Sequence, residues 1–205
     1  MEPDRTRIPL HHARYWEAGD PPLLDSAVKV FFSPKTYIRV CKHAHSDLDN
    51  EIGGWLLGRW CWDEEQLEEF IVIDATLPAE DVIHSGTFLT FTSASQVQML
   101  EQKEERFPDK VVVGWYHTHP KMSLFLSSHD LWLHKHFFPH PWQVALVIEP
   151  HARLGGFFIR DRDHQLDSRH HYGFYELTDP ERSSVVHWQN LNHVEPAIPG
   201  SEELE

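Results

Sequence analysis

The stretch VVVGWYHTHPKMSLFLSSHD, residues 111–130, joins a strand-like apolar run to a polar loop and a helix start. Alternate residues of a strand point to the same face, so His117 and His119 would present two imidazoles side by side. Ser127 has the character of a helix N-cap, and Asp130 would fall in the first turn, where the helix dipole favours a negative charge. The stretch therefore predicts a strand, a loop and a helix that bring polar side chains together.

Histidine spacing alone does not identify a site in this chain. Seventeen histidines in 205 residues would produce about one or two His-x-His pairs by chance, and the sequence contains three pairs. The pairs that begin at His43 and His134 lie in expected helices, where residues two apart diverge by roughly 200°. The strand context therefore favours the pair formed by His117 and His119.

Two imidazoles need a third ligand to hold a first-row metal, and a hydrolytic zinc site also leaves a position for water. Asp130 can supply a carboxylate if the loop folds the helix start back over the strand end. A helix start also explains Ser127 and Asp130 without a metal, and the two interpretations are compatible because a capped helix start is rigid. His134 could be a fourth ligand, but packing beside the site is favoured because water needs the open position.

Composition predicts a folded protein without a nucleic-acid or membrane role. An apolar content of 40% and an aromatic content of 12% over 205 residues support one domain with tails. The formal net charge of −14 would repel phosphate backbones, and no run approaches the roughly 18 apolar residues of a membrane span. Cys41 and Cys61 match no zinc-ribbon or disulfide-scaffold spacing, so we expect reduced thiols in a cytoplasmic protein.

Periodicity and turn residues predict a mixed α/β architecture, with a central β-sheet flanked by helices. The expected strands cover residues 27–32, 70–77, 111–117, 142–150, 154–160 and 173–177, another begins near Glu51, and the expected helices cover 34–45, 93–106 and the residues after Ser127. The short turn between residues 150 and 154 predicts antiparallel neighbours. The helix at 93–106 is expected to turn Val97, Met99 and Leu100 towards the core.

The polar residues of this stretch resemble the JAMM motif of the MPN-plus metalloproteases. HTHP at 117–120, followed by SSHD at 127–130, fills every signature position of H-[ST]-H-P-x(n)-S-x-x-D. The family also carries an upstream E-x-x-G-x-L-x-G pattern, which EIGGWLLG at 51–58 matches. The resemblance covers residues 27–160, is nearest to AMSH-type and prokaryotic members, and implies a cytidine-deaminase-like MPN/JAB1 fold.

This resemblance implies a zinc-dependent isopeptidase that cleaves the bond after the C-terminus of ubiquitin or a ubiquitin-like protein. One catalytic Zn²⁺ would be held by His117, His119 and Asp130, with one position left for water. Glu51 would accept the proton of that water and pass it to the leaving amine, and Ser127 would hydrogen-bond the water or the developing oxyanion. The expected partners are ubiquitin-like proteins and their conjugates, in a prokaryotic setting within conjugation or antiviral operons.

Two other functions stay open on the same residues. A hydrolase of this fold could release a small amino acid from the C-terminus of a sulfur-carrier protein. A non-catalytic MPN scaffold assembles complexes without zinc, but such modules usually lack the ligands that this chain keeps.

The chain departs from AMSH-type enzymes where those bind a second, structural zinc. Trp132 stands in the place of a ligand histidine and no cysteine follows Cys61, so that site is not expected. The loop that contains His164, His170 and His171 is interpreted as solvated and histidine-rich.

Regions outside the motif receive coarser predictions. Residues 1–25 are expected to form an extended arm docked through its aromatic side chains, residues 26–194 the JAMM/MPN-plus catalytic domain, and residues 195–205 an acidic disordered tail. Residues 78–92 fall where family members carry a flap over the substrate tail. The apolar side chains of this segment would either grip an extended peptide or pack onto the core.

Overall fold

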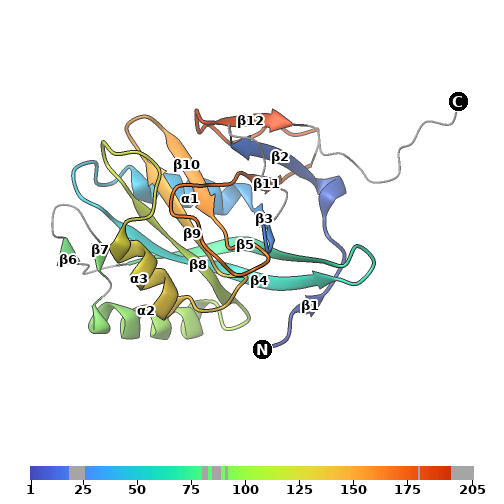
Figure 1. Cartoon of the computed structure of the whole chain (residues 1–205), viewed down its shortest axis with the longest axis horizontal. Coiled ribbons are helices and arrows are strands. Elements are labelled where there is room, and N and C mark those ends of the chain that lie inside the picture. The colour runs from blue at the N-terminus through green and yellow to red at the C-terminus, as the bar shows by residue number, and fades with distance from the viewer. Residues whose placement is uncertain (19–25, 80–82, 85–88, 91, 180, 195–205) are drawn as a thin grey trace, which may run out of the picture.

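The computed structural model of the chain describes residues 1–18, 26–79, 83–84, 89–90, 92–179 and 181–194. Within these ranges the chain forms three α-helices, a short 3-10 helix and twelve strands (Figure 1). In chain order the elements are β1 (Asp4–Arg5), η1 (Leu10–His12), β2 (Ala13–Ala18), β3 (Lys29–Phe32), α1 (Pro34–Ala44), β4 (Gly53–Asp63), β5 (Glu68–Pro78), β6 (Ile83–His84), β7 (Leu89–Thr90), α2 (Ser93–Arg106), β8 (Val111–Thr118), α3 (Ser128–Phe137), β9 (Val144–Glu149), β10 (Leu154–Phe158), β11 (Phe174–Leu177) and β12 (Leu191–Val194).

The main sheet is mixed. Its strands follow the order β10-β9-β8-β4-β5-β3-β11-β2-β12. The short strand β1 also pairs with β4 but stands outside this order. β3 is parallel to β5 and β11, and β8 is parallel to β9, whereas β4 is antiparallel to both β5 and β8. β9 and β10 form the antiparallel pair that the short turn predicts. The expected mixed α/β fold, a central sheet flanked by helices, is confirmed.

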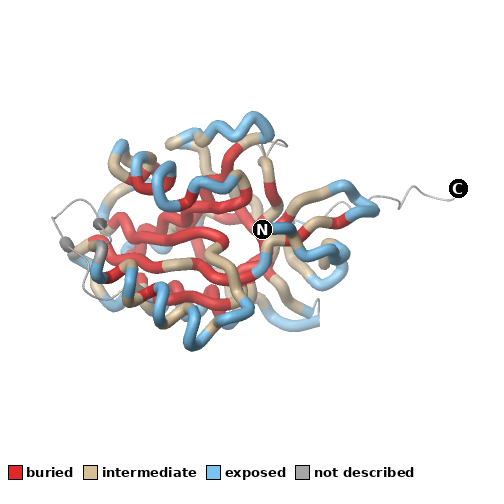
Figure 2. Tube along the Cα trace, turned by 90° about the horizontal axis from the view of Figure 1, so that it is seen from below, coloured by how far each residue is buried: buried red, intermediate tan, exposed pale blue. Residues whose placement is uncertain are grey.

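Helices cover both faces of this sheet. Tyr37 of α1 packs into one core cluster with Tyr116 of β8. Met99 of α2 and Leu133 of α3 pack into another cluster with Trp115. Adjacent residues of β8 therefore face different layers, as the two-residue period of a strand requires. Figure 1 shows α2 and α3 together on one side of the sheet, and Figure 2 shows the buried segments running through the interior of the molecule.

The N-terminal segment contributes two strands, β1 and β2, to the main sheet. β2 lies between β11 and β12, and it pairs antiparallel with both. Backbone pairing with β11 and β12 holds residues 13–18, which the sequence did not predict. The aromatic side chains of Tyr15 and Trp16 also contact Tyr175 and His193. The division of the chain at residues 25 and 194 stays a prediction, and the tail at 195–205 lies outside the described residues.

The apolar face predicted for α2 is partly wrong. Met99 is buried, but Val97 and Leu100 are 58% and 52% exposed. Ser95 takes the buried position one turn before Met99, where its N–H and its hydroxyl both donate hydrogen bonds to Thr92. Because these bonds satisfy its polar groups, Ser95 can face the core at small cost. The helix therefore turns Ser95 and Met99 towards the core and leaves Val97 and Leu100 exposed to solvent.

Two glycines in EIGGWLLG, residues 51–58, are required by close backbone contacts. The register of β4 against β5 is irregular between Leu57 and Gly58. A Cβ on Gly58 would lie 1.7 Å from the carbonyl oxygen of Val72, and a Cβ on Gly54 would lie 2.2 Å from that of Leu77. The tight pairing of β4 with β5 therefore depends on the absence of these side chains.

The substitution Gly58→Ala tests this packing. It is expected to lower the free energy of unfolding by about 1–3 kcal/mol, because β4 or β5 must shift to admit the methyl group. Thermal unfolding followed by circular dichroism measures the change. Leu67→Gly is the control: Leu67 is exposed in the β4–β5 turn with φ 53°, so glycine there should not lower the Tm. An unchanged Tm for Gly58→Ala would contradict the close contact.

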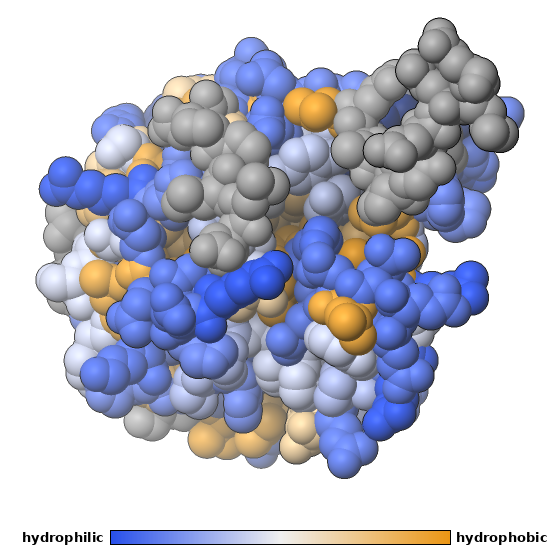
Figure 3. Space-filling model, turned by 45° about the vertical axis from the view of Figure 1, so that its right-hand side comes forward, coloured by the Kyte–Doolittle hydropathy of each residue, from blue (hydrophilic) through white to orange (hydrophobic). Residues whose placement is uncertain are grey.

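The surface and the cysteines agree with the composition. On the face shown in Figure 3, apolar side chains lie in small groups among hydrophilic ones. Cys41 and Cys61 are both buried and free, as expected. No helix in the described ranges is long and apolar enough to span a membrane. The side chains of residues 80–91, which include the apolar residues of the expected flap, lie outside those that the structure describes.

Candidate metal centre

The HTHP stretch begins at the end of β8, which lies between β4 and β9. The Thr118 N–H donates to the carbonyl of Ile52 at 2.8 Å, and the Ile52 N–H donates to Oγ1 of Thr118 at 3.0 Å. On the other side, the His119 N–H donates to the carbonyl of Ile148 at 2.8 Å. The backbone that carries both histidines is therefore fixed from two sides.

Three buried side chains converge at this strand end. His117, His119 and Asp130 are 0%, 2% and 1% exposed. The two Nε2 atoms are 2.9 Å apart, and the Asp130 oxygens lie 3.5 Å from Nε2 of His117 and 3.7 Å from Nε2 of His119. Ligand atoms around a tetrahedral zinc ion are about 3.3 Å from one another, so this donor set fits one ion. No other group of three or more such ligands is found among the described residues.

Contacts behind each ring fix its orientation. Nδ1 of His119 faces the carbonyl of Ser123 at 3.3 Å, so Nδ1 carries the proton and the Nε2 lone pair is left for a metal. The ring of His117 stacks on the Trp115 indole, with ring centres 4.5 Å apart and planes 8° apart. Trp115 Nε1 in turn donates to Nδ1 of His134 at 3.0 Å. A backbone carbonyl therefore orients the His119 imidazole, and a side chain orients the His117 imidazole, without a metal.

His134 lies outside the group of candidate ligands and contacts Trp115 instead. It is buried, and burial lowers its pKa to about 3, so the neutral ring accepts the hydrogen bond from Trp115 at ordinary pH. This geometry agrees with the packing role favoured over a fourth ligand. His136, the other member of this pair, is exposed, as the divergence of helical positions two apart predicts.

Ser127 and Asp130 form a capping box at the start of α3. Oγ of Ser127 accepts from the Asp130 N–H at 3.2 Å, and the Asp130 carboxylate accepts from the Ser127 N–H at 2.7 Å. The predicted N-cap is confirmed. Burial raises the pKa of Asp130, but the facing His117 and hydrogen bonds from both histidines and Ser127 outweigh it and hold that pKa well below its usual range. The carboxylate is therefore charged, as a metal ligand must be.

Glu51 lies in the segment that pairs with the strand carrying the two histidines. Ile52 pairs with Thr118, so the antiparallel register places Glu51 opposite His119. Glu51 is 5% exposed, which is rare for a glutamate. The sequence predicted Glu51 near the beginning of a strand, and it lies two residues before β4. Chain segments that are far apart in the sequence therefore meet at the histidine pair.

One buried carboxylate beside the site was not singled out from the sequence. Glu149, the last residue of β9, is 2% exposed and accepts backbone N–H bonds from Lys121, His151 and Ala152. Burial raises its pKa, but these bonds outweigh that effect and lower it. The available signal was a charged residue that ends the apolar run VALVIE.

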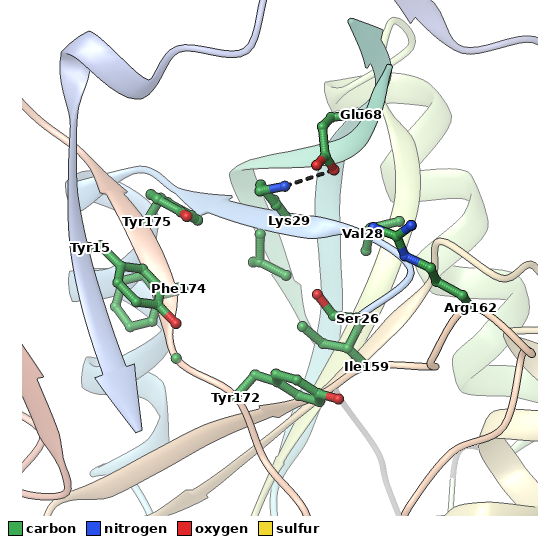
Figure 4. Close-up of a pocket in the computed structure, with 12 residues that line it drawn as sticks. Tyr15, Ser26, Val28, Lys29, Glu68, Ile159, Arg162, Tyr172, Phe174 and Tyr175 are labelled. Carbon is green, nitrogen blue, oxygen red and sulfur yellow. Dashed lines mark ion pairs between the residues drawn. The ribbon is translucent and has the colours of Figure 1, made fainter. Parts of the chain in front are cut away.

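A separate cavity of about 240 Å³ lies beside β3 and β11 (Figure 4). Three tyrosines and the Lys29–Glu68 ion pair, 2.7 Å long, are among its lining residues. None of the candidate site residues lines it. A second cavity lies at the start of α3 and is lined by residues 123–127, Ser168 and Arg169. The cavity beside β3 and β11 therefore has no part in the candidate metal centre.

Comparison with known proteins relates this site to a family. The family model described as "JAB1/Mov34/MPN/PAD-1 ubiquitin protease" matches residues 25–138, which contain Glu51, Ser127 and the three candidate ligands. The chain is 26% identical over 195 residues to the 26S proteasome non-ATPase regulatory subunit 14 of Dictyostelium discoideum, covering 86% of this chain and 59% of that protein. It is 27% identical over 151 residues to the ubiquitin carboxyl-terminal hydrolase RPN11 of Saccharomyces cerevisiae, covering 70% and 46%. The chain thus spans about half the length of these relatives.

A solved structure shares the fold. The solution structure of a protein from Desulfitobacterium hafniense matches with a TM-score of 0.55 at 20% identity, covering 74% of this chain and 95% of that chain. At this identity the likeness shows the fold alone. The resemblance drawn from the HTHP and SSHD stretches is confirmed by the family match, which spans more than half of the 205 residues. The chain therefore belongs to the JAB1/Mov34/MPN/PAD-1 ubiquitin protease family.

Proposed function

We propose that this chain is a zinc-dependent isopeptidase that cleaves the bond after the C-terminus of ubiquitin or a ubiquitin-like protein in the cytoplasm. The observation that carries the proposal is the convergence of three buried ligands, His117, His119 and Asp130, within 4.8 Å of one another. A set of two imidazoles and one carboxylate suits zinc and leaves a position open for chemistry. The name of the yeast relative, a ubiquitin carboxyl-terminal hydrolase, supports the substrate class.

The chain's own residues divide the remaining work. Bound zinc supplies a Lewis acid that lowers the pKa of water from 15.7 to about 7. Glu51 accepts the proton of the attacking water and later donates it to the leaving amine. The Ser127 hydroxyl, held beside Asp130 by the capping box, donates a hydrogen bond to the oxyanion that develops on the scissile carbonyl. The burial of Glu51 and the ligands excludes competing water from these groups.

Two substitutions at Ser127 separate its structural and chemical roles. Ser127→Ala is expected to lower kcat by about 10²-fold, because an oxyanion donor is lost, and the free energy of unfolding by about 1 kcal/mol, because the N-cap is lost. Ser127→Gly should lower kcat equally. It should lower the free energy of unfolding by only roughly a few tenths of a kcal/mol, since glycine is a tolerated N-cap. Steady-state kinetics and thermal unfolding measure both effects. Full kcat in Ser127→Gly would remove the hydroxyl from the mechanism.

A cleavage panel tests the proposed function. Metal-free protein is reloaded with zinc and incubated with isopeptide-linked ubiquitin conjugates, precursors of ubiquitin-like proteins, and a C-terminally extended sulfur-carrier protein. We expect cleavage of a ubiquitin-like substrate, abolished by a zinc chelator and restored by added zinc. Cleavage of the sulfur-carrier substrate alone would assign the smaller hydrolase activity. No cleavage of any substrate would favour a non-catalytic scaffold.

A further inference from the structure

We propose that Glu149 is a positioning residue that holds the segment carrying Glu51 against the ligand strand. The inference rests on the proposed role of Glu51 and extends it to the residues that place Glu51. It is carried by a chain of contacts that leads from one buried carboxylate to the turn before Glu51.

The first link is the carboxylate of Glu149 itself. Its Oε1 accepts the N–H of Lys121 at 2.9 Å and that of His151 at 3.1 Å, and its Oε2 accepts the N–H of Ala152. Lys121 follows the HTHP stretch directly and has φ 63°, a left-handed conformation that is uncommon outside glycine. Bonds from backbone N–H groups to an ionised carboxylate are stronger than neutral ones, so Glu149 stabilises the backbone after the HTHP stretch and the backbone after β9.

The second link consists of the side chains of two of these residues. Nζ of Lys121 donates to Oδ1 of Asp49 at 3.0 Å, and Nε2 of His151 donates to the carbonyl of Leu48 at 2.9 Å. Glu149 fixes the backbone of both donors, and both side chains reach the same short segment of another part of the chain. Lys121 and His151 therefore hold two adjacent residues, Asp49 and Leu48, of the segment before Glu51.

The third link is the turn that precedes Glu51. Oδ1 of Asp47 accepts the N–H groups of Asp49 at 3.0 Å and Asn50 at 2.9 Å, which makes residues 47–50 a closed turn. Ile52, on the other side of Glu51, is bonded to β8. Glu51 is therefore held between a fixed strand pair and a turn whose position depends on Lys121 and His151. Loosening of the turn moves Glu51 without touching a metal ligand.

Glu149→Gln tests the first link. The amide keeps the shape but replaces one acceptor oxygen with an NH₂ group, so a backbone N–H loses its partner. We expect faster backbone hydrogen exchange at residues 47–52, zinc stoichiometry as in the wild type, and KM within about twofold. The expected fall in kcat is about tenfold, because a displacement of about 1 Å can cost up to 10²-fold.

Glu176→Gln is the matched control. Glu176 of β11 is also buried, at 1% exposure, and accepts hydrogen bonds from Trp16 of β2 and from Ser184 and Val185 between β11 and β12. This variant should lower the Tm as Glu149→Gln does, while kcat and exchange at residues 47–52 stay at wild-type values. A merely structural role for Glu149 predicts that the two variants behave alike.

A charge exchange tests the second link. Lys121→Asp and Asp49→Lys should each lower kcat by about two- to fivefold, a modest effect because the pair is exposed, and the double variant should recover most of the loss. Arg5→Asp, which breaks the exposed ion pair with Glu64 at the other end of β4, should leave kcat unchanged. Failure of the double variant to recover activity would remove this contact from the positioning chain.

The measurements distinguish failure of this inference from failure of the proposed function. Unchanged exchange and kcat in Glu149→Gln, or equal losses of kcat in Glu176→Gln, would overturn the positioning role. If the wild type cleaves no substrate, the isopeptidase proposal fails, and hydrogen exchange at residues 47–52 alone decides whether Glu149 holds the turn.

Discussion

Replacing Glu51 with glutamine is expected to lower kcat by about 10²–10⁴-fold, the usual contribution of a general base or acid. Glutamine has nearly the same shape but cannot accept the proton of the attacking water. Because the antiparallel register places residue 51 opposite His119, the substitution changes a neighbour of the three candidate ligands and none of the three themselves. KM should change little, since the lost interaction is made in the transition state.

Zinc content and thermal unfolding are the controls for Glu51→Gln. We expect the variant to bind as much zinc as the wild type and to unfold within a few degrees of it. Loss of zinc would mean that Glu51 acts in metal binding rather than as the base. Wild-type kcat with zinc bound would show that another group accepts the proton.

Replacing Asp130 with asparagine is expected to remove zinc. The amide keeps an oxygen that can accept the Ser127 N–H, so α3 should retain its N-cap. It removes the negative charge that faces His117 and His119. Loss of a residue that hydrogen-bonds to a metal ligand typically weakens metal binding by about 10–100-fold. Loss of a charged ligand itself should weaken zinc binding by more. Zinc titration followed by calorimetry measures this, and cleavage should fall below detection.

Thermal unfolding gives an independent measure for Asp130→Asn. Zinc present at about 1,000 times its Kd stabilises the native state by about 4 kcal/mol, so added zinc should raise the Tm of the wild type and not that of the variant. His136→Ala is the matched control, because His136 is an exposed histidine on the same helix. Wild-type zinc affinity in Asp130→Asn would exclude Asp130 from the ligand set.

The features predictable from the sequence are those encoded by neighbouring residues. The N-cap at Ser127 and the side-by-side imidazoles at His117 and His119 follow from local rules on capping and strand period. The β9–β10 hairpin follows from the length of its turn. The place of Glu51 at the site came from a resemblance and not from periodicity, because the neighbouring contact between Ile52 and Thr118 joins residues 66 apart.

Other features depend on contacts that no local pattern encodes. β2 joins the sheet by pairing with strands more than 150 residues later in the chain, and its residues ARYWEA show no clear alternation. The rotation of α2 follows from the hydrogen bonds that let Ser95 face the core. The function of Glu149 is visible only when the backbone groups of Lys121, His151 and Ala152 meet around it.

Titration of zinc into the metal-free protein, with cleavage of an isopeptide-linked ubiquitin-like conjugate as the readout, tests the proposed metalloenzyme most directly. The ligand set of His117, His119 and Asp130 predicts no cleavage without metal, a rise with added zinc, and a plateau at one equivalent. Cleavage at full rate in the metal-free protein, or no cleavage of any such conjugate at one bound zinc, would contradict it.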